Sequence, residues 1–157
     1  MNWDFLFGLI EALVSVVGLP LLLWSLREMA RQTNLAAKAT RASIYQNVAT
    51  AMIEFDRFFV DHSELKPYFY GGKEIPEDHP DYARVMSVAE MLVDFMDEVT
   101  VLSPIVPKYL PWDTWKSYFQ DLFVSSPALR NYWAEHKKWY PETLQKLLDS
   151  ITEPEIT

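Results

Sequence analysis

The run from Phe5 to Ser25 constrains this chain more than any other stretch, because its 21 residues carry a single charged side chain, Glu11. As an α-helix, the run is about 31 Å long, close to the thickness of the hydrocarbon core of a bilayer. Trp3 and Trp24 stand near its ends, where indole rings prefer the membrane interface. A cleaved signal peptide fits less well, since no basic residue precedes the run and no small-residue cleavage site follows it. The sequence therefore predicts a transmembrane anchor over residues 1–26.

Basic residues follow this predicted span at once. The positive-inside rule then places the N-terminus outside and the rest of the chain in the cytoplasm, with a single span. The alanine-rich composition of residues 27–43 predicts that the helix continues as a juxtamembrane stalk. Basic side chains beside a membrane also attract anionic lipid head groups. The residues expected to contact them are Arg27, Arg31, Lys38 and Arg41.

Glu11 belongs to a stripe of small and polar residues within the predicted span. Its members lie three or four residues apart and so share one face of a helix: Gly8, Glu11, Ser15, Gly18, Leu22 and Ser25. Small residues let membrane helices approach closely, and a carboxylate that faces lipid is costly. The stripe therefore predicts a contact between copies of the chain or with another membrane protein, or the lining of a pore. A simpler alternative is that Glu11 lies near the membrane interface or is protonated.

The rest of the chain is predicted to be all-α, with a small cytoplasmic helical bundle over residues 44–151 and a tail over residues 152–157. Apolar residues recur at helical spacing over residues 44–61 and again over residues 81–102. No segment shows convincing strand alternation. The core positions of these two helices are Ile44, Val48, Met52 (or Ala51), Phe55, Phe59, Val85, Val88, Leu92, Phe95, Val99 and Leu102.

Three further helices are predicted from capping signals. Pro111 is expected to start one of them, and Ser126, followed by a proline, to cap the next. The helix after Ser126 is expected to extend to Tyr140, because Pro141 then ends it and starts the last one. The stretch between the first core helix, which ends near residue 61, and the two glycines at 71–72 is expected to be a turn.

Composition excludes several classes of site. The chain has no cysteine, so a disulfide, a thiolate metal site and a cysteine nucleophile are absent. The three histidines are far apart and lack metal-ligand spacing, and four glycines cannot form a phosphate-binding loop. Residues 61–157 carry nine basic and seventeen acidic side chains, which makes nucleic acid an unlikely partner. The sequence therefore predicts no metal, no cofactor and no catalytic residues.

One short motif favours a competing function. The stretch "RNYWAEH", from Arg130 to His136, resembles the R-N/H/D-x-x-x-x-H element of HEPN-domain ribonucleases. The resemblance implies an all-helical, membrane-tethered enzyme in which the guanidinium of Arg130 holds a phosphate and the imidazole of His136 moves protons. Residues six apart on a straight helix do not share a face, however, and His136 lies between apolar positions. A packed structural histidine is the alternative interpretation.

Aromatic residues are dense in the second half of the chain. A small bundle cannot easily bury all of them, so some are expected to face a partner protein. The core and a ligand pocket are the other interpretations. The predicted partner surface consists of Tyr68, Tyr70, Trp112, Trp115 and Trp139.

Two stretches, "HSELKPYFYGGKEIPEDHPDYAR" and "DLFVSSPALRNYWAEHKKWYP", resemble an uncharacterised bacterial group of membrane-anchored proteins with similar "ELRPYFY" and "SPALRxYW" segments. The resemblance implies a bacterial inner-membrane protein with one N-terminal span, a stalk and a small helical domain. It implies no activity. The layout also resembles membrane-bound effectors of bacterial defence systems. The predicted function is non-enzymatic assembly, as a homo-oligomer or as a small subunit of a membrane complex, with an anchored adaptor and the ribonuclease as alternatives.

Overall fold

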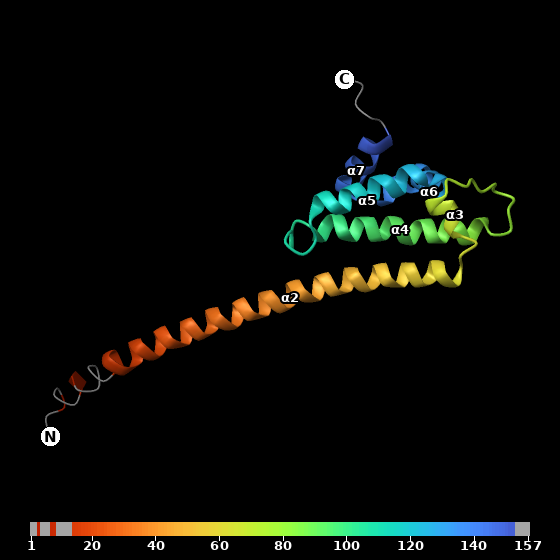
Figure 1. Cartoon of the computed structure of the whole chain (residues 1–157). Coiled ribbons are helices and arrows are strands. Elements are labelled where there is room, and N and C mark those ends of the chain that lie inside the picture. Colours follow the sequence, from red (N-terminus) through yellow and green to blue (C-terminus); the bar gives the residue numbers. More distant parts are fainter. Residues whose placement is uncertain (1–2, 4–6, 9–13, 153–157) are drawn as a thin grey trace. The chain divides into compact units, whose positions relative to one another are not determined.

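The computed structural model describes residues 3, 7, 8 and 14–152, and it divides into two units, Met1–Ala42 and Ser43–Thr157 (Figure 1). Every regular element in the described residues is helical, and none is a strand, so the predicted all-α class is confirmed.

In the first unit, a π-helical turn, η1 (Val14–Gly18), leads into α2 (Leu19–Asp61), whose residues up to 42 belong to this unit. Pro20 explains the wider turn, because proline has no N–H to donate to the carbonyl four residues earlier. Among the described residues, no helix is both long enough and apolar enough to cross a membrane. Glu11 lies outside the described residues, as does the side chain of Ser15.

The second unit is a bundle in which α4 (Tyr82–Leu102) packs against three other helices. These are α5 (Trp112–Ser125), α6 (Pro127–His136) and α7 (Glu142–Thr152). The predicted core helix over residues 81–102 is confirmed, because five of its six core positions are buried and the sixth packs against the core.

Residues 43–61 of α2 join this bundle through large side chains. Val48 is 1% exposed, and the ring of Phe55 lies 5.6 Å from that of Phe95 in an edge-on contact. Phe59 packs 5.5 Å from Phe69. The helix predicted over residues 44–61 is therefore confirmed, and aromatic rings bridge it to the other helices.

The stretch expected to be a turn contains a short helix, α3 (Lys66–Tyr70), which packs against α5 and α6. Gly71 caps it, and Gly72 follows with a φ of 67°, a backbone conformation that glycine adopts without strain. Five residues are too few to show a helical period, so this element could not be told from a turn.

Ser126 caps α6 as predicted. Its hydroxyl oxygen accepts a hydrogen bond from the amide of Leu129, at 3.1 Å, and its hydroxyl donates to the carbonyl of Tyr68, at 2.9 Å. The expected extension of this helix to Tyr140 is wrong. The α-helix ends at His136, and a 3₁₀ turn, η2 (Lys137–Trp139), follows. Tyr140 is extended because it precedes a proline, which disfavours the helical conformation.

Replacing Ser126 with alanine is expected to lower the free energy of unfolding by about 1–2 kcal/mol. The substitution leaves the buried amide of Leu129 and the carbonyl of Tyr68 without their partner. Chemical denaturation measures the change. Ser117→Ala is the control, because that exposed hydroxyl bonds only to a carbonyl of its own helix. An equal loss in both variants would contradict the role of the cap.

Candidate functional site

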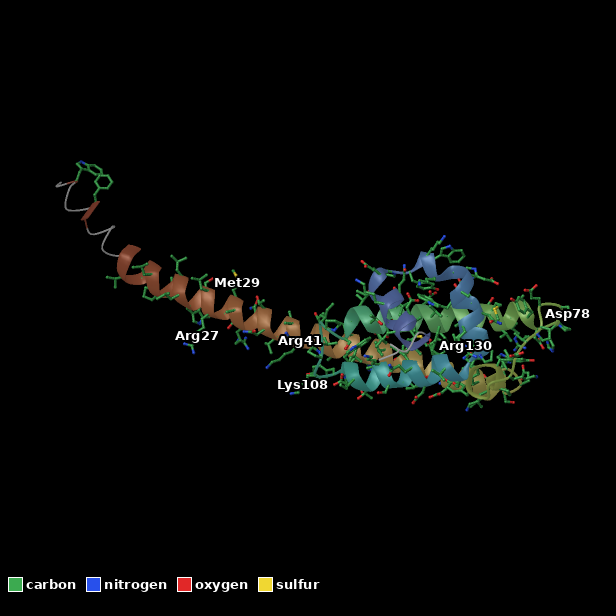
Figure 2. All side chains as sticks on the ribbon, turned by 90° about the horizontal axis from the view of Figure 1, so that it is seen from above. Arg27, Met29, Arg41, Asp78, Lys108 and Arg130 are labelled. Atoms are coloured by element: carbon green, nitrogen blue, oxygen red, sulfur yellow. The ribbon has the colours of Figure 1, made fainter. Side chains whose placement is uncertain are left out.

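The N-terminal unit exposes a run of large apolar side chains. Each of the following is at least half exposed, and in a monomeric soluble protein so many exposed large apolar side chains in one segment are unusual. They are Phe7, Val16, Val17, Leu19, Leu21, Leu22, Leu23, Trp24, Leu26 and Met29. Figure 2 labels Met29 among the side chains of this unit. This surface is available to another chain or to lipid.

Gly8, Gly18, Leu22 and Ser25 are the members of the predicted stripe whose side chains or Cα positions the structure describes. A methyl group added at Gly8 would meet no atom within 4 Å. Leu22 is 61% exposed, Ser25 is exposed and Gly18 is half-buried. The small size of Gly8 is therefore not required by the packing of the described residues around it.

The predicted lipid-contact residues are all exposed on α2. Their spacing of four, seven and three residues places Arg27, Arg31, Lys38 and Arg41 on one side of the helix. The guanidinium of Arg31 pairs with Glu28 at 2.6 Å, and this hydrogen bond lowers the pKa of the Glu28 carboxyl. One of the four positive charges is thus partly neutralised within the helix.

The two residues of the ribonuclease-like motif have different surroundings. The guanidinium of Arg130 donates hydrogen bonds to the carbonyls of Phe123 and Val124, at the end of α5, where the helix itself supplies no partner. The Nδ1 atom of His136 lies 3.0 Å from the carbonyl of Tyr132, and its ring stacks on the ring of Tyr132 with centroids 4.4 Å apart. Arg130 lines a surface hollow with Glu74 and Asn131, among others, and His136 is not part of its lining.

The five residues of the predicted aromatic surface do not form one surface. Tyr68 is only 3% exposed, because α3 packs against α5 and α6, so its inclusion was wrong. Trp112 and Trp115 are partly buried against the core, and the ring of Trp115 lies 5.7 Å from that of Phe95. Tyr70 and Trp139 are 40% and 69% exposed and are the most exposed of the five.

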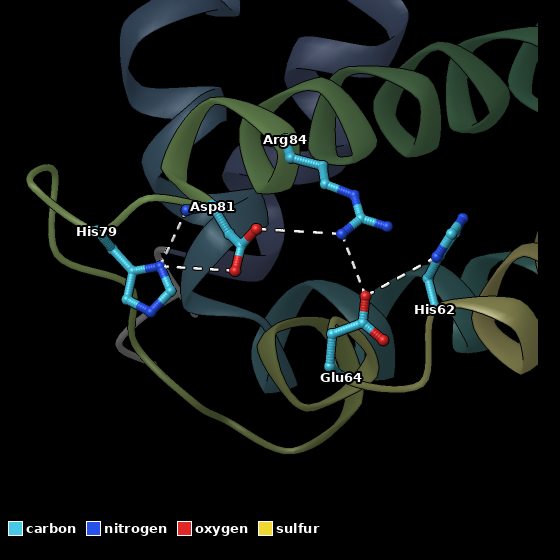
Figure 3. A network of polar contacts seen from close by, with 5 residues as sticks. All are labelled: His62, Glu64, His79, Asp81 and Arg84. Atoms are coloured by element: carbon cyan, nitrogen blue, oxygen red, sulfur yellow. Dashed lines mark hydrogen bonds and ion pairs between the residues drawn. The ribbon is translucent and has the colours of Figure 1, made fainter.

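A network of charged side chains connects the start of α4 to the segment after α2 (Figure 3). Arg84 pairs with Glu64 at 3.1 Å and with Asp81 at 4.0 Å. His79 accepts a hydrogen bond from the amide of Asp81, and His62 lies 3.8 Å from Glu64. These groups are largely exposed, and exposed ion pairs contribute little to stability. In the described part of the chain, no three histidine or carboxylate side chains are placed to hold a metal ion.

A groove between α2 and α4 in the second unit has a volume of about 470 Å³. We call it the α2–α4 groove. Its lining is Ala51, Glu54, Phe55 and Phe58 from α2, and Met91, Asp94, Phe95 and Glu98 from α4. Sequence reasoning missed this groove. The available signal was the pair of acids at Asp94 and Glu98, which border the apolar face of the predicted helix.

A hydrogen bond from Tyr140 holds one of these acids in place, and Tyr132 in turn contacts the hydroxyl of Tyr140. The hydroxyl of Tyr140 donates to Asp94 at 2.9 Å and lies 3.1 Å from the hydroxyl of Tyr132. Burial raises the pKa of both tyrosines, so both remain protonated at neutral pH. Nearby, the Oδ1 atom of Asp97 is buried without a hydrogen-bond partner. Burial, together with the charge of Asp94, raises the pKa of the Asp97 carboxyl.

Asp97→Asn is therefore expected to raise the melting temperature at pH 7, by roughly 2–4 °C. A raised pKa means that the folded chain holds this proton to a higher pH than the unfolded chain does. The contribution of Asp97 to wild-type stability is then greatest below the unfolded pKa of about 4 and falls as the pH rises through the raised value. Melting curves from pH 3.5 to 7.5 should show the advantage of Asp97→Asn shrinking as the pH falls. The exposed Asp121→Asn is the control, and an advantage of Asp97→Asn that is constant with pH would contradict the prediction.

Comparison with models of protein families, with curated proteins and with solved structures gave no match to this chain.

Proposed function

We propose that this chain is a non-enzymatic, membrane-anchored protein that acts by assembling with other copies of itself. Residues 1–26 form the anchor, and the bundle lies on the cytoplasmic side of a bacterial inner membrane. The observation that carries the proposal is the run of exposed, unpacked apolar side chains over the described residues up to Met29, with Leu19 and Leu22 each more than 60% exposed. Outside an assembly or a lipid phase, such a surface is unfavourable.

The orientation and the mode of contact follow from neighbouring residues. Arg27 and Arg41, both exposed, support a cytoplasmic position for the start of the stalk and contacts with anionic head groups. The stripe through Gly18, Leu22 and Ser25 supports contact between copies, because close approach of helices in lipid depends on small side chains.

The ribonuclease is placed second, because the Nη1 atom of Arg130 bonds two carbonyls of α5 and His136 does not line the hollow that Arg130 lines.

Cysteine cross-linking tests the proposal directly, because the chain has no cysteine of its own. Single cysteines replace Leu22, on the stripe, and Leu23, on another face of α2. The two leucines are 61% and 67% exposed and are therefore matched in accessibility. Each full-length variant is oxidised in native membranes, and disulfide-linked dimers are measured on non-reducing gels.

The expected result is a strong dimer band for Leu22→Cys and little for Leu23→Cys, with Ser25→Cys behaving like Leu22→Cys. Equal bands at both leucines would mean random collision and would contradict assembly through the stripe. No dimer at any position would favour the anchored adaptor. Washing the same membranes tests the anchor independently of the assembly, because a chain without an anchor would be released by the wash.

A further inference from the structure

We propose that the α2–α4 groove binds an amphipathic helix of a partner protein, whose apolar face is flanked by lysine or arginine side chains. This site belongs to the second unit alone, so the proposal does not depend on the anchor or on assembly through it.

The shape of the groove fits a helix. The lining residues have the same spacing on both walls, since positions 51, 54, 55 and 58 of α2 correspond to positions 91, 94, 95 and 98 of α4. Each wall therefore extends over two helical turns, about 10 Å. A third helix laid between them would contact both walls with side chains at i, i+3, i+4 and i+7.

The floor of the groove is apolar and adaptable. Phe55 and Phe95 close its base and are 9% and 5% exposed. Phe58 is half-buried beside them, and Met91 is 52% exposed at the edge. Methionine has a flexible, polarisable side chain that adjusts to different apolar surfaces. Filling the groove would bury Met91 and the exposed part of Phe58, which favours an occupant with leucine-like side chains.

The charges around this floor are all negative. Glu54, Asp94 and Glu98 are the only ionisable residues that line the groove, so no lysine or arginine lines it. The hydroxyl of Tyr140 holds the Asp94 carboxylate in place, as described above. Fixed carboxylates beside an apolar surface select a partner with cations at matching positions, through charge-assisted hydrogen bonds and steering.

The same charges disfavour a second copy of this chain as the occupant. In a symmetric dimer formed through the groove, each surface would meet itself. The carboxylates of Glu54, Asp94 and Glu98 would then face the same three carboxylates on the partner, and like charges at an interface are repulsive.

The test uses the full chain in discs of phosphatidylcholine, which carry no net charge, with empty discs as the baseline. The probe is a fluorescent peptide of leucine and lysine, about 18 residues long, with leucines at helical i, i+3, i+4 and i+7 spacing. A peptide with glutamate in place of lysine is the charge control. Fluorescence anisotropy measures binding of the peptide to wild type and to two variants. One variant combines Glu54→Gln with Glu98→Gln. The other, Ala51→Phe, fills the groove without changing its charge.

The matched control variant combines Asp121→Gln with Glu135→Gln, which also removes two acids from exposed helical positions. We expect saturable binding of the lysine peptide to wild type, at least tenfold weaker binding to both groove variants, unchanged binding to the control variant, and none of the glutamate peptide. Circular dichroism establishes that each variant is folded.

Three results would overturn the proposal. The first is the absence of saturable binding to wild type. The second is equal weakening by the control variant, which would indicate general attraction to an acidic protein. The third is undiminished binding to Glu54→Gln with Glu98→Gln and to Ala51→Phe, which would place the peptide elsewhere. None of these results bears on cross-linking at Leu22, so failure of this proposal and failure of the proposed function are distinguishable.

Discussion

Replacing Phe119 with alanine is expected to lower the free energy of unfolding of the second unit by about 3–5 kcal/mol. Phe119 is fully buried on α5, and its ring contacts those of Trp115, at 5.7 Å, and Phe95, at 6.3 Å. Truncation removes apolar surface from the core and leaves a cavity between α4 and α5 that the surrounding rings cannot fill. Denaturant unfolding followed by tryptophan fluorescence measures the loss, with Trp115 close to the site of the change.

Val124→Ala provides the comparison, because Val124 is on the same helix but is 63% exposed. We expect its effect to remain within about 0.5 kcal/mol of wild type. A loss for Phe119→Ala no larger than this would mean that α5 does not pack on α4 as described here.

The second large effect concerns the anchor. Substituting aspartate for both Val17 and Leu21 is expected to move the full chain from the membrane fraction to the supernatant. On the insertion scale, aspartate at the centre of a membrane helix is about 3 kcal/mol less favourable than an apolar residue, and less so near the ends. Both side chains are at least half exposed, so the substitutions disturb no packing among the described residues. Carbonate washing of membranes, followed by immunoblotting, measures the distribution.

The control makes the same change in the second unit. Ile53 and Val101 are 57% and 52% exposed, which matches the two anchor positions. Ile53→Asp with Val101→Asp is expected to leave the chain in the membrane fraction. If both double variants leave the membrane, general destabilisation rather than loss of an anchor explains the result, and retention of both would mean that residues 17 and 21 are not in the membrane.

The longer helices of the bundle were predictable because each of them buries one face and exposes the other. In α4, five of the eight buried residues recur at alternating spacings of three and four, which is the period of an amphipathic helix. Ser126 was predictable for a different reason, since a cap depends only on its immediate neighbours in the chain. Such local signals do not depend on which helices finally pack together.

Features that depend on packing between helices were not predictable in the same way. Tyr68 and Tyr70 are the same residue type two positions apart, yet Tyr68 is 3% exposed and Tyr70 is 40% exposed, although the hydroxyl of Tyr70 also reaches that of Tyr118 on α5. The α2–α4 groove depends on the distance at which Phe55 and Phe95 hold two helices apart. Arg130 bonds carbonyls of α5 across the extended residue Ser126, which separates α5 from α6, so the motif alone could not reveal these partners.

The mass of the protein particle in mild detergent tests the proposed assembly of copies of this chain through residues 1–26. Light scattering, with the contribution of the detergent subtracted, is applied to wild type and to Glu11→Leu. The account predicts a discrete oligomer for wild type and a different or smaller particle for Glu11→Leu, because a carboxyl group at a helix contact has polar partners that leucine cannot replace. A monomer in both samples would contradict the account.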